Sequence, residues 1–143
     1  MNILVLNGPN LNLLGEREPE IYGRQTLADI EEMLRQEAGR FKTDLHFLQS
    51  NHEGVLIDAI HAERKWMDGL IFNPGALAHY SYALRDAVAS VMKPMVEVHL
   101  SDLLLREEFR HNSVFQGLPN VRLIMGRGAQ GYLSALRLLA DAV

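Results

Sequence analysis

The sequence predicts a single α/β domain in which a parallel β-sheet is covered by helices on both faces. The chain has 143 residues, a length that suits one domain with a substantial core. Short apolar runs alternate along it with segments whose apolar residues recur at helical spacing. The runs are almost continuously apolar, as is typical of strands buried on both faces. Strand–helix alternation of this kind gives parallel strands joined by right-handed crossovers.

Five apolar runs are the expected strands: Ile3–Leu6, Leu45–Leu48, Leu70–Phe72, Met95–Val98 and Val121–Met125. Four amphipathic segments are the expected helices: Thr26–Phe41, Gly54–Met67, Tyr80–Val91 and Tyr132–Ala142. Thr26 and Asp29 form a capping-box pattern at the start of the first helix, and Pro94 prevents the third from continuing much further. Because no internal repeat or linker-like segment interrupts this pattern, residues 1–143 are expected to form one domain.

Composition and charge argue against several classes of protein. Hydrophobic residues make up 48% of the chain and charged residues 22%, which are ordinary values for a globular protein. A net charge of −4 does not favour nucleic acid as a partner. Without cysteine there is no disulfide, no zinc–thiolate site and no cysteine nucleophile. The histidines show no metal-binding spacing, so no metal site is expected.

The sequence shows no sign of membrane insertion or secretion. No apolar stretch approaches the ~18 residues that a membrane helix needs. Residues 1–10 lack the basic start and the long apolar core of a secretory signal. We therefore expect a soluble, cytoplasmic protein that binds no membrane.

The chemically reactive residues gather after the predicted strands. Five segments carry them: Asn7–Gly23, Gln49–Gly54, Asn73–His79, Glu97–Ser101 and Gly126–Gly131. Ligands of open α/β sheets bind beyond the carboxyl ends of the strands, where these segments meet. The clustering therefore predicts a ligand site along this edge of the sheet.

The first of these connections is unusually long. Residues 7–25 span 19 positions, whereas a strand-to-helix connection usually has about 2–6. A connection of this length without regular structure is usually functional, and often a lid. Tyr22 could act there as a general base if a nearby cation stabilised its phenolate, and Arg17 is the candidate cation. The alternative is a mobile surface loop in which the tyrosine packs and the arginine is solvated.

Strand alternation places Glu97 and His99 on the same face of the fourth predicted strand. A carboxylate two residues away can orient an imidazole, fix its tautomer and favour its protonated form, as a general acid requires. The alternative is a structural histidine paired with Glu97 in the core.

Two further groups are candidates for substrate binding. Asn73 begins a tight turn after the third strand, and His79 is expected at the start of the following helix, where backbone amides could also hold a carboxylate. The alternative for this segment is ordinary turn chemistry. Arg106 and Arg110 are one helical turn apart and could clamp an anion, unless they belong to a solvated charged helix.

The segment GRGAQG fits a dinucleotide-binding pattern only superficially. That fingerprint needs an acidic residue about 20 positions later, within a βαβ unit. Here only 12 residues follow Gly131, and they include no further strand. No phosphate-binding GK[ST] sequence occurs either, so no nucleotide cofactor is expected.

Taken together, these segments resemble the type II 3-dehydroquinate dehydratases. The blocks that carry the resemblance are NGPNLNLLGEREPEIYG, QSNHEG, NPGALAH with YALRDA, VEVHLSD with REEFRH, and GAQGY. They occur in order from Asn7 to Leu139, and the first block is the most specific.

The resemblance implies a flavodoxin-like three-layer fold with a five-stranded parallel sheet in the order 2-1-3-4-5. It implies one catalytic domain over residues 1–143 and a homododecamer built as a tetramer of trimers. The implied activity is that of a lyase without a cofactor. It would dehydrate 3-dehydroquinate to 3-dehydroshikimate by anti elimination through an enolate. This step belongs to the shikimate pathway of aromatic amino acid biosynthesis, and quinate breakdown uses it too.

The resemblance also implies catalytic roles at matching positions. Tyr22 would remove the proton beside the ketone, and Arg17 would hold Tyr22 as the phenolate. His99 would protonate the departing hydroxyl, with Glu97 orienting it. Asn10 would help to bind the water that stabilises the enolate oxygen.

The implied substrate contacts within one chain are Asn73, His79, Leu100, Ser101 and Arg110. Asp86 would reach the site from a neighbouring subunit of the trimer. Four positions depart from the family pattern: Leu77, Ala78, Asp102 and Leu104. Because none of them is an implied catalytic position, they bear on the pocket and on subunit contacts rather than on the reaction.

Two other functions remain open alternatives. One is a catalytically silent flavodoxin-like binding module, against which the joint presence of Arg17, Tyr22 and His99 argues. The other is flavin or nucleotide binding, which only analogy of fold suggests.

Overall fold

The computed structural model describes residues 1–142. Its centre is a five-stranded, fully parallel sheet in the order β2-β1-β3-β4-β5, so the predicted fold class and strand order are confirmed. The strands are β1 (Asn2–Asn7), β2 (Asp44–Gln49), β3 (Gly69–Asn73), β4 (Met95–His99) and β5 (Val121–Met125).

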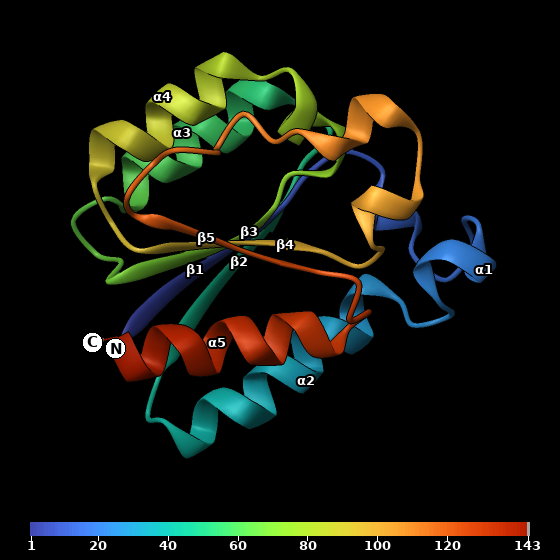
Figure 1. Ribbon diagram of the computed structural model, residues 1–143. Coiled ribbons are helices and arrows are strands. Elements are labelled where there is room, and N and C mark those ends of the chain that lie inside the picture. Colours follow the sequence, from blue (N-terminus) through green and yellow to red (C-terminus); the bar gives the residue numbers. More distant parts are fainter. Residues whose placement is uncertain (143) are drawn as a thin grey trace.

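Two layers of helices cover the sheet (Figure 1). One layer holds α2 (Leu27–Arg40) and α5 (Gln130–Ala142), which pack against each other, and the other holds α3 (Glu53–Glu63) and α4 (Tyr82–Val91). Each layer buries its own core against one face of the sheet. Successive residues of β1 illustrate this, because Ile3 and Val5 belong to the α2/α5 core whereas Leu4 and Leu6 belong to the α3/α4 core.

Continuous burial holds only for the three central strands. Every residue of β3 and β4 is buried, and in β1 only Asn2 is partly exposed. The edge strands β2 and β5 are only partly buried, and Leu123 of β5 is exposed. The expectation that all five runs are covered on both faces is therefore wrong for these two, because an edge strand has a neighbour on one side only.

The helix boundaries differ from prediction where local hydrogen bonds end or begin a helix. The capping box of α2 is present, with Thr26 and Asp29 each accepting the other's backbone N–H. The start of α4 is at Tyr82 rather than Tyr80, because the Ser81 side chain accepts the backbone N–H of Leu84. The preceding residues Gly75–His79 form a 3₁₀ helix, η2. Of the predicted helix Gly54–Met67, the part after Glu63 is not helical.

The connection after β1 contains regular structure, contrary to the sequence-based expectation. Residues 8–26, here called the flap, include the 3₁₀ helix η1 (Leu11–Leu13) and the short α1 (Pro19–Tyr22). α1 stands at the side of the molecule where the strands end (Figure 1). Within the described residues, no helix is long and apolar enough to span a membrane.

The connection after β4 does not form the single helix on which Arg106 and Arg110 would be one turn apart. It contains η3 (Leu103–Leu105) and η4 (Glu108–His111), with Arg106 in extended backbone between them. These segments follow the carboxyl end of β4, η2 follows that of β3, and the flap follows that of β1.

Candidate active site

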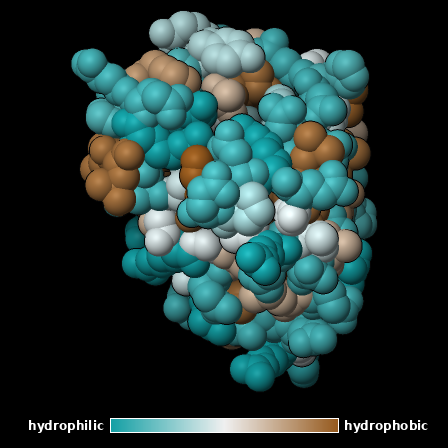
Figure 2. All heavy atoms as spheres, turned by 90° about the vertical axis from the view of Figure 1, so that its right-hand side faces the viewer, coloured by the Kyte–Doolittle hydropathy of each residue, from teal (hydrophilic) through white to brown (hydrophobic). Residues whose placement is uncertain are grey.

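A cavity of about 220 Å³ opens at the carboxyl edge of the sheet, as the sequence predicts. The surface on this side is mostly hydrophilic, with separate hydrophobic side chains (Figure 2). Nine of the predicted site residues line the cavity: Asn10, Arg17, Tyr22, Asn73, His79, His99, Leu100, Ser101 and Arg110. Glu97 lies behind His99, and Asp86 is exposed on α4 and does not line the cavity. The four departures from the family pattern do not line it either.

Tyr22 lies between two guanidinium groups. Nη1 of Arg106 donates a hydrogen bond to the Tyr22 hydroxyl at 2.8 Å. The guanidinium carbon of Arg17 lies 4.7 Å from the centroid of the Tyr22 ring. The predicted nearness of Arg17 to Tyr22 is therefore present. Arg106 bonds the oxygen, and its guanidinium carbon also lies 5.2 Å from the centroid of the ring. Among residues 1–142, Tyr22 is the one tyrosine that lines the cavity, and two guanidinium groups contact its side chain.

The contact with Arg106 is the main feature that sequence reasoning missed. Arg106 was a candidate anion clamp beside Arg110, and no local pattern connects it with Tyr22, which is 84 positions away. Its side chain is 11% exposed, and its Nε is buried without a hydrogen-bond partner among residues 1–142. A buried guanidinium donor without a partner suits a ligand oxygen that would supply one.

His99 and Glu97 form a short hydrogen bond at the end of β4. Nε2 of His99 donates to Oε2 of Glu97 at 2.6 Å, and both side chains are almost fully buried. The predicted pairing on one strand face is present. His99 also lines the cavity, and its Nδ1 is the ring nitrogen that Glu97 does not engage. The pair therefore joins a buried carboxylate to an imidazole at the cavity wall, as a proton donor requires.

His79 lies beside His99 as a neutral imidazole. It is the last residue of η2 rather than the start of α4, and its Nδ1 donates to the Asn112 carbonyl at 2.8 Å. The two imidazole rings are nearly parallel, with centroids 6.3 Å apart. Burial lowers the pKa of His79, and the positive charges of His99 and Arg110 lower it further, against the opposing effect of the Asn112 carbonyl. With Nδ1 protonated, Nε2 of neutral His79 is free to accept a hydrogen bond.

Asn73 is fixed by a buried hydrogen-bond network beneath the cavity. Its Nδ2 donates to the Tyr132 hydroxyl at 3.0 Å, and that hydroxyl donates to Oδ1 of Asn7 at 2.6 Å. Parallel register places Asn7 beside Asn73 at the ends of β1 and β3. Oδ1 of Asn73 accepts the Gly75 N–H at 3.2 Å, which closes the predicted tight turn. The sequence placed Tyr132 only on a helix and gave no sign of this role.

Asn10 on the flap and Ser101 after β4 also line the cavity. Asn10 has φ of 70°, which is uncommon for a residue other than glycine, and its backbone N–H donates to Oδ1 of Asn51 at 2.9 Å. Ser101 follows β4, and its Oγ lies 3.4 Å from Nη1 of Arg106. Arg110 donates through Nε to Glu107 at 2.9 Å, and this bond is the main reason why the pKa of Glu107 is lowered.

The cavity is electropositive although the chain is acidic. Arg17, Arg106 and Arg110 line it, and no carboxylate among the described residues does. Within residues 1–142, no group of three His, Asp or Glu residues is placed to hold a metal ion. The lining therefore suits a small anionic ligand bearing hydroxyl groups.

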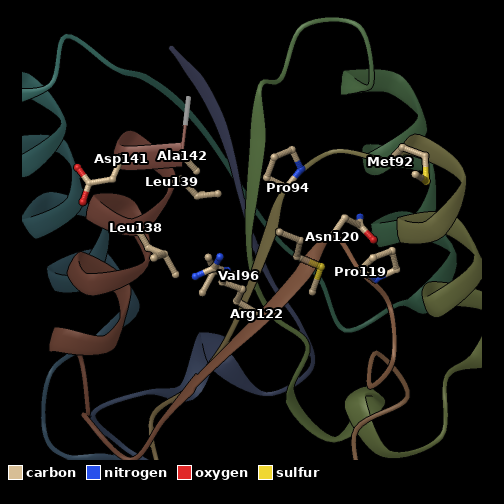
Figure 3. A pocket seen from close by; sticks show the side chains of 11 residues that line it. Met92, Pro94, Val96, Pro119, Asn120, Arg122, Leu138, Leu139, Asp141 and Ala142 are labelled. Carbon is tan, nitrogen blue, oxygen red and sulfur yellow. The ribbon is translucent and has the colours of Figure 1, made fainter.

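A second cavity of about 380 Å³ lies where β4 and β5 begin, at the opposite end of the strands. Leu138 and Asp141 of α5 lie on one side of it, and Met92 and Pro119 lie on the other (Figure 3). It contains no predicted site residue and no histidine or tyrosine. The tyrosine and the histidines predicted at the site therefore lie in the cavity at the carboxyl edge.

Comparison with known proteins agrees with the resemblance. A family model described as dehydroquinase class II matches residues 1–140. The 3-dehydroquinate dehydratase of Bacillus subtilis (strain 168) is 56% identical over 138 residues, which cover 96% of this chain and 93% of that protein. The 3-dehydroquinate dehydratase of Dinoroseobacter shibae is 57% identical over 136 residues, covering 95% of this chain and 90% of that protein.

Solved structures show the same architecture. The type II dehydroquinase from Butyrivibrio crossotus superimposes with a TM-score of 0.93 at 45% identity, covering 97% of each chain. The type II dehydroquinase from Propionibacterium acnes gives a TM-score of 0.92 at 39% identity, covering 98% of this chain and 96% of the other. With a family model matching nearly its full length and relatives more than half identical, this chain belongs to the dehydroquinase class II family.

Proposed function

We propose that this protein is a lyase that dehydrates 3-dehydroquinate to 3-dehydroshikimate by anti elimination through an enolate, without a cofactor. The observation that carries the proposal is one cavity in which a guanidinium bonds the Tyr22 hydroxyl and a Glu97-paired His99 forms the wall. Relatives named 3-dehydroquinate dehydratase are more than 50% identical to this chain. Their activity matches the chemistry available in the cavity.

Tyr22 is the base in this proposal. A proton beside a ketone is weakly acidic, so its removal requires a strong base together with stabilisation of the resulting oxyanion. A phenolate is a stronger base than a carboxylate, and a neighbouring cation makes it available at neutral pH. Arg106 supports the phenolate through the hydrogen bond to its oxygen, and Arg17 supports it through the ring face.

His99 is the acid. Tyr22 takes the proton beside the ketone and leaves an enolate, and the electrons of the enolate then expel the hydroxyl group. That hydroxyl takes a proton from the imidazolium of His99 and leaves as water, so that protons and electrons balance. Glu97 stabilises the imidazolium through the 2.6 Å hydrogen bond. An anti elimination requires the base and the acid on opposite faces of the substrate, and Tyr22 on the flap and His99 on β4 belong to different segments that line the cavity.

The remaining cavity residues bind and orient the substrate. Asn10 helps to hold the water that stabilises the enolate oxygen. The arginines attract the substrate carboxylate, while polar groups bond its hydroxyls. The proposed substrate contacts within the chain are Asn73, His79, Leu100, Ser101 and Arg110.

We also propose that the protein acts as a homododecamer, a tetramer of trimers. Asp86 supports this because it is exposed on α4 and does not line its own chain's cavity. In a trimer it would complete the site of a neighbouring subunit. The exposed Tyr80 and Tyr82 at the start of α4 offer apolar area for such a contact.

The activity is tested by adding 3-dehydroquinate to the purified protein and following ultraviolet absorbance. The product is a conjugated enone acid, so absorbance should rise, and neither EDTA nor borohydride should stop it because the route uses no metal and no Schiff base. A folded protein that produces no absorbance rise would contradict the proposal. Binding of the substrate without turnover would favour a catalytically silent module instead.

A further inference from the structure

Ser113 lies behind the His99–Glu97 pair and holds the second oxygen of the carboxylate. Its Oγ donates to Oε1 of Glu97 at 2.7 Å, while Oε2 accepts from Nε2 of His99 at 2.6 Å. Glu97 is 1% exposed, so these two donors replace the water that a surface carboxylate would bind. Ser113 does not line the cavity, so its effect on a substrate must pass through Glu97.

Ser113 is itself held in place by the segment that carries it. The backbone N–H of Phe115 donates to Ser113 Oγ at 3.1 Å, which directs the hydroxyl proton toward the carboxylate. The backbone N–H of Val114 donates to the Ala78 carbonyl at 2.7 Å. Phe115 is 1% exposed and packs edge-on against Phe72, with ring centroids 6.0 Å apart. The hydroxyl is therefore presented by a segment anchored in the core.

We propose that Ser113 is a positioning residue for the general acid: by fixing the Glu97 carboxylate, it keeps the His99 imidazole oriented with Nδ1 toward the cavity. The inference rests on the proposed function, because it takes His99 as the group that protonates the departing hydroxyl. A carboxylate held by only one donor can rotate, and its charge is less well stabilised. In a smaller fraction of the enzyme molecules, the His99 imidazolium then has its Nδ1 directed toward the cavity.

The surroundings of His99 make this support necessary. Glu97 is the carboxylate bonded to it, whereas the cavity that His99 lines contains three arginines and, among the described residues, no carboxylate. The charged and titratable groups that line the same cavity are His79 on η2, Arg106 and Arg110 beside and on η4, and Arg17 and Tyr22 on the flap.

The two steps of the reaction separate the role of the acid from that of the base. Reversal of the first step in D₂O places deuterium on the carbon beside the ketone of recovered substrate. Dehydration requires the second step as well, in which His99 donates its proton. A defect confined to the acid therefore slows dehydration while leaving exchange, whereas general damage to the fold slows both.

The test compares exchange and dehydration in variants of Ser113. Ser113→Ala should lower kcat for dehydration about tenfold and leave KM little changed. A tenfold loss is a part of the rate enhancement of about 10²–10⁴-fold that general acid catalysis supplies, because His99 itself remains. The ratio of deuterium exchange to dehydration should rise by a similar factor. Ser113→Thr keeps the hydroxyl and should restore both values. Ser113→Cys is close in size but a weaker donor, so it should reproduce the alanine result even if Ser113→Ala folds poorly.

Ser50→Ala is the matched control. Ser50 Oγ also accepts a backbone N–H two residues later, from His52 at 3.0 Å, but Ser50 does not line the cavity. Its variant should keep the wild-type ratio. Parallel losses of exchange and dehydration in Ser113→Ala and Ser113→Cys, or no loss at all, would overturn the inference alone. A wild-type protein that catalyses neither process would overturn the proposed function and the inference together.

Discussion

Two arginines contact the Tyr22 side chain: both lie over its ring, and Arg106 also bonds its hydroxyl. Arg106 bonds the oxygen at 2.8 Å, and this charge-assisted hydrogen bond strengthens when the phenol ionises. Arg17 lies over the ring at 4.7 Å, where its attraction is less directional. The stabilisation of the base is therefore shared unequally, with the larger part expected from Arg106.

The arginines can be ranked by substitution. Arg106→Gln should lower kcat/KM about 10–100-fold, as expected for the loss of a hydrogen bond to a charged group worth about 1.5–3 kcal/mol. Arg17→Gln should cost less, about 2–20-fold. Steady-state kinetics of the two variants and the wild type at a single pH compare the two losses. A larger loss of kcat/KM from Arg17→Gln than from Arg106→Gln would contradict this ranking.

At this scale, the sequence predicts contacts between residues that are close along the chain and misses contacts between residues that are far apart. Arg17 and Tyr22 are five positions apart, and Glu97 and His99 are two apart, so a local pattern predicts that they meet. The contacts of Tyr22 with Arg106 and of Asn73 with Tyr132 join residues 84 and 59 positions apart. Only the folded sheet brings those segments together.

At the scale of elements, the flap holds Tyr22, the proposed base, with little regular structure. α1 has only four residues, too few to be stable alone, and Tyr22 is its last residue. Gly23 follows with φ 82° and ψ −179°, a conformation that is essentially restricted to glycine. The direction in which the chain leaves Tyr22 therefore depends on this glycine.

Replacement of Gly23 should damage catalysis more than stability. A Cβ at this position would meet no atom within 4 Å, so Gly23→Ala introduces backbone strain of about 1–3 kcal/mol and no clash. The flap can relieve that strain by moving Tyr22, and kcat should fall while the melting temperature changes little. Gly39→Ala is the control, because Gly39 lies in α2 and its Cβ would also meet no atom within 4 Å. The Gly39→Ala variant should keep wild-type activity. Equal kcat values for Gly23→Ala and Gly39→Ala would argue against a role for Gly23.

Element boundaries were predictable where side chains define them. The Thr26–Asp29 capping box gives the start of α2 directly. The 3₁₀ helices η2 and η4 have no side-chain cap, and η2 is held by tertiary contacts such as the Val114 N–H to the Ala78 carbonyl. In η3 the Asp102 side chain accepts the Leu104 N–H, but one such contact does not identify a three-residue helix in a sequence. The sequence therefore located His79 and Arg106 beside the site but misjudged the elements that carry them.

At the scale of the whole molecule, an acidic chain encloses a positively charged cavity. The net charge of −4 gives no hint of this, because the three arginines that line the cavity come from two separate segments. The strand order 2-1-3-4-5 followed from family resemblance, since apolar periodicity alone fixes parallel strands but not their neighbours. The partial exposure of β2 and β5 is a consequence of that order.

The role of Asp86 belongs to this scale, because its own chain does not use it at the site. Asp86→Ala should lower activity by at least about tenfold if the carboxylate completes a neighbouring site with charged hydrogen bonds. Folding of the subunit should be unchanged, since Asp86 is exposed. Kinetics together with light scattering check this. Full activity of an Asp86→Ala protein that keeps its assembly would contradict the proposed contribution between subunits.

The central claim, that Tyr22 is the base and His99 the acid, is tested most directly by deuterium exchange into 3-dehydroquinate in D₂O. Tyr22→Phe should abolish both exchange and dehydration, because it removes the group that takes the proton. His99→Asn should retain exchange while losing dehydration, because the enolate still forms and returns. Wild-type exchange in Tyr22→Phe would contradict the account, since another group would then have to remove the proton.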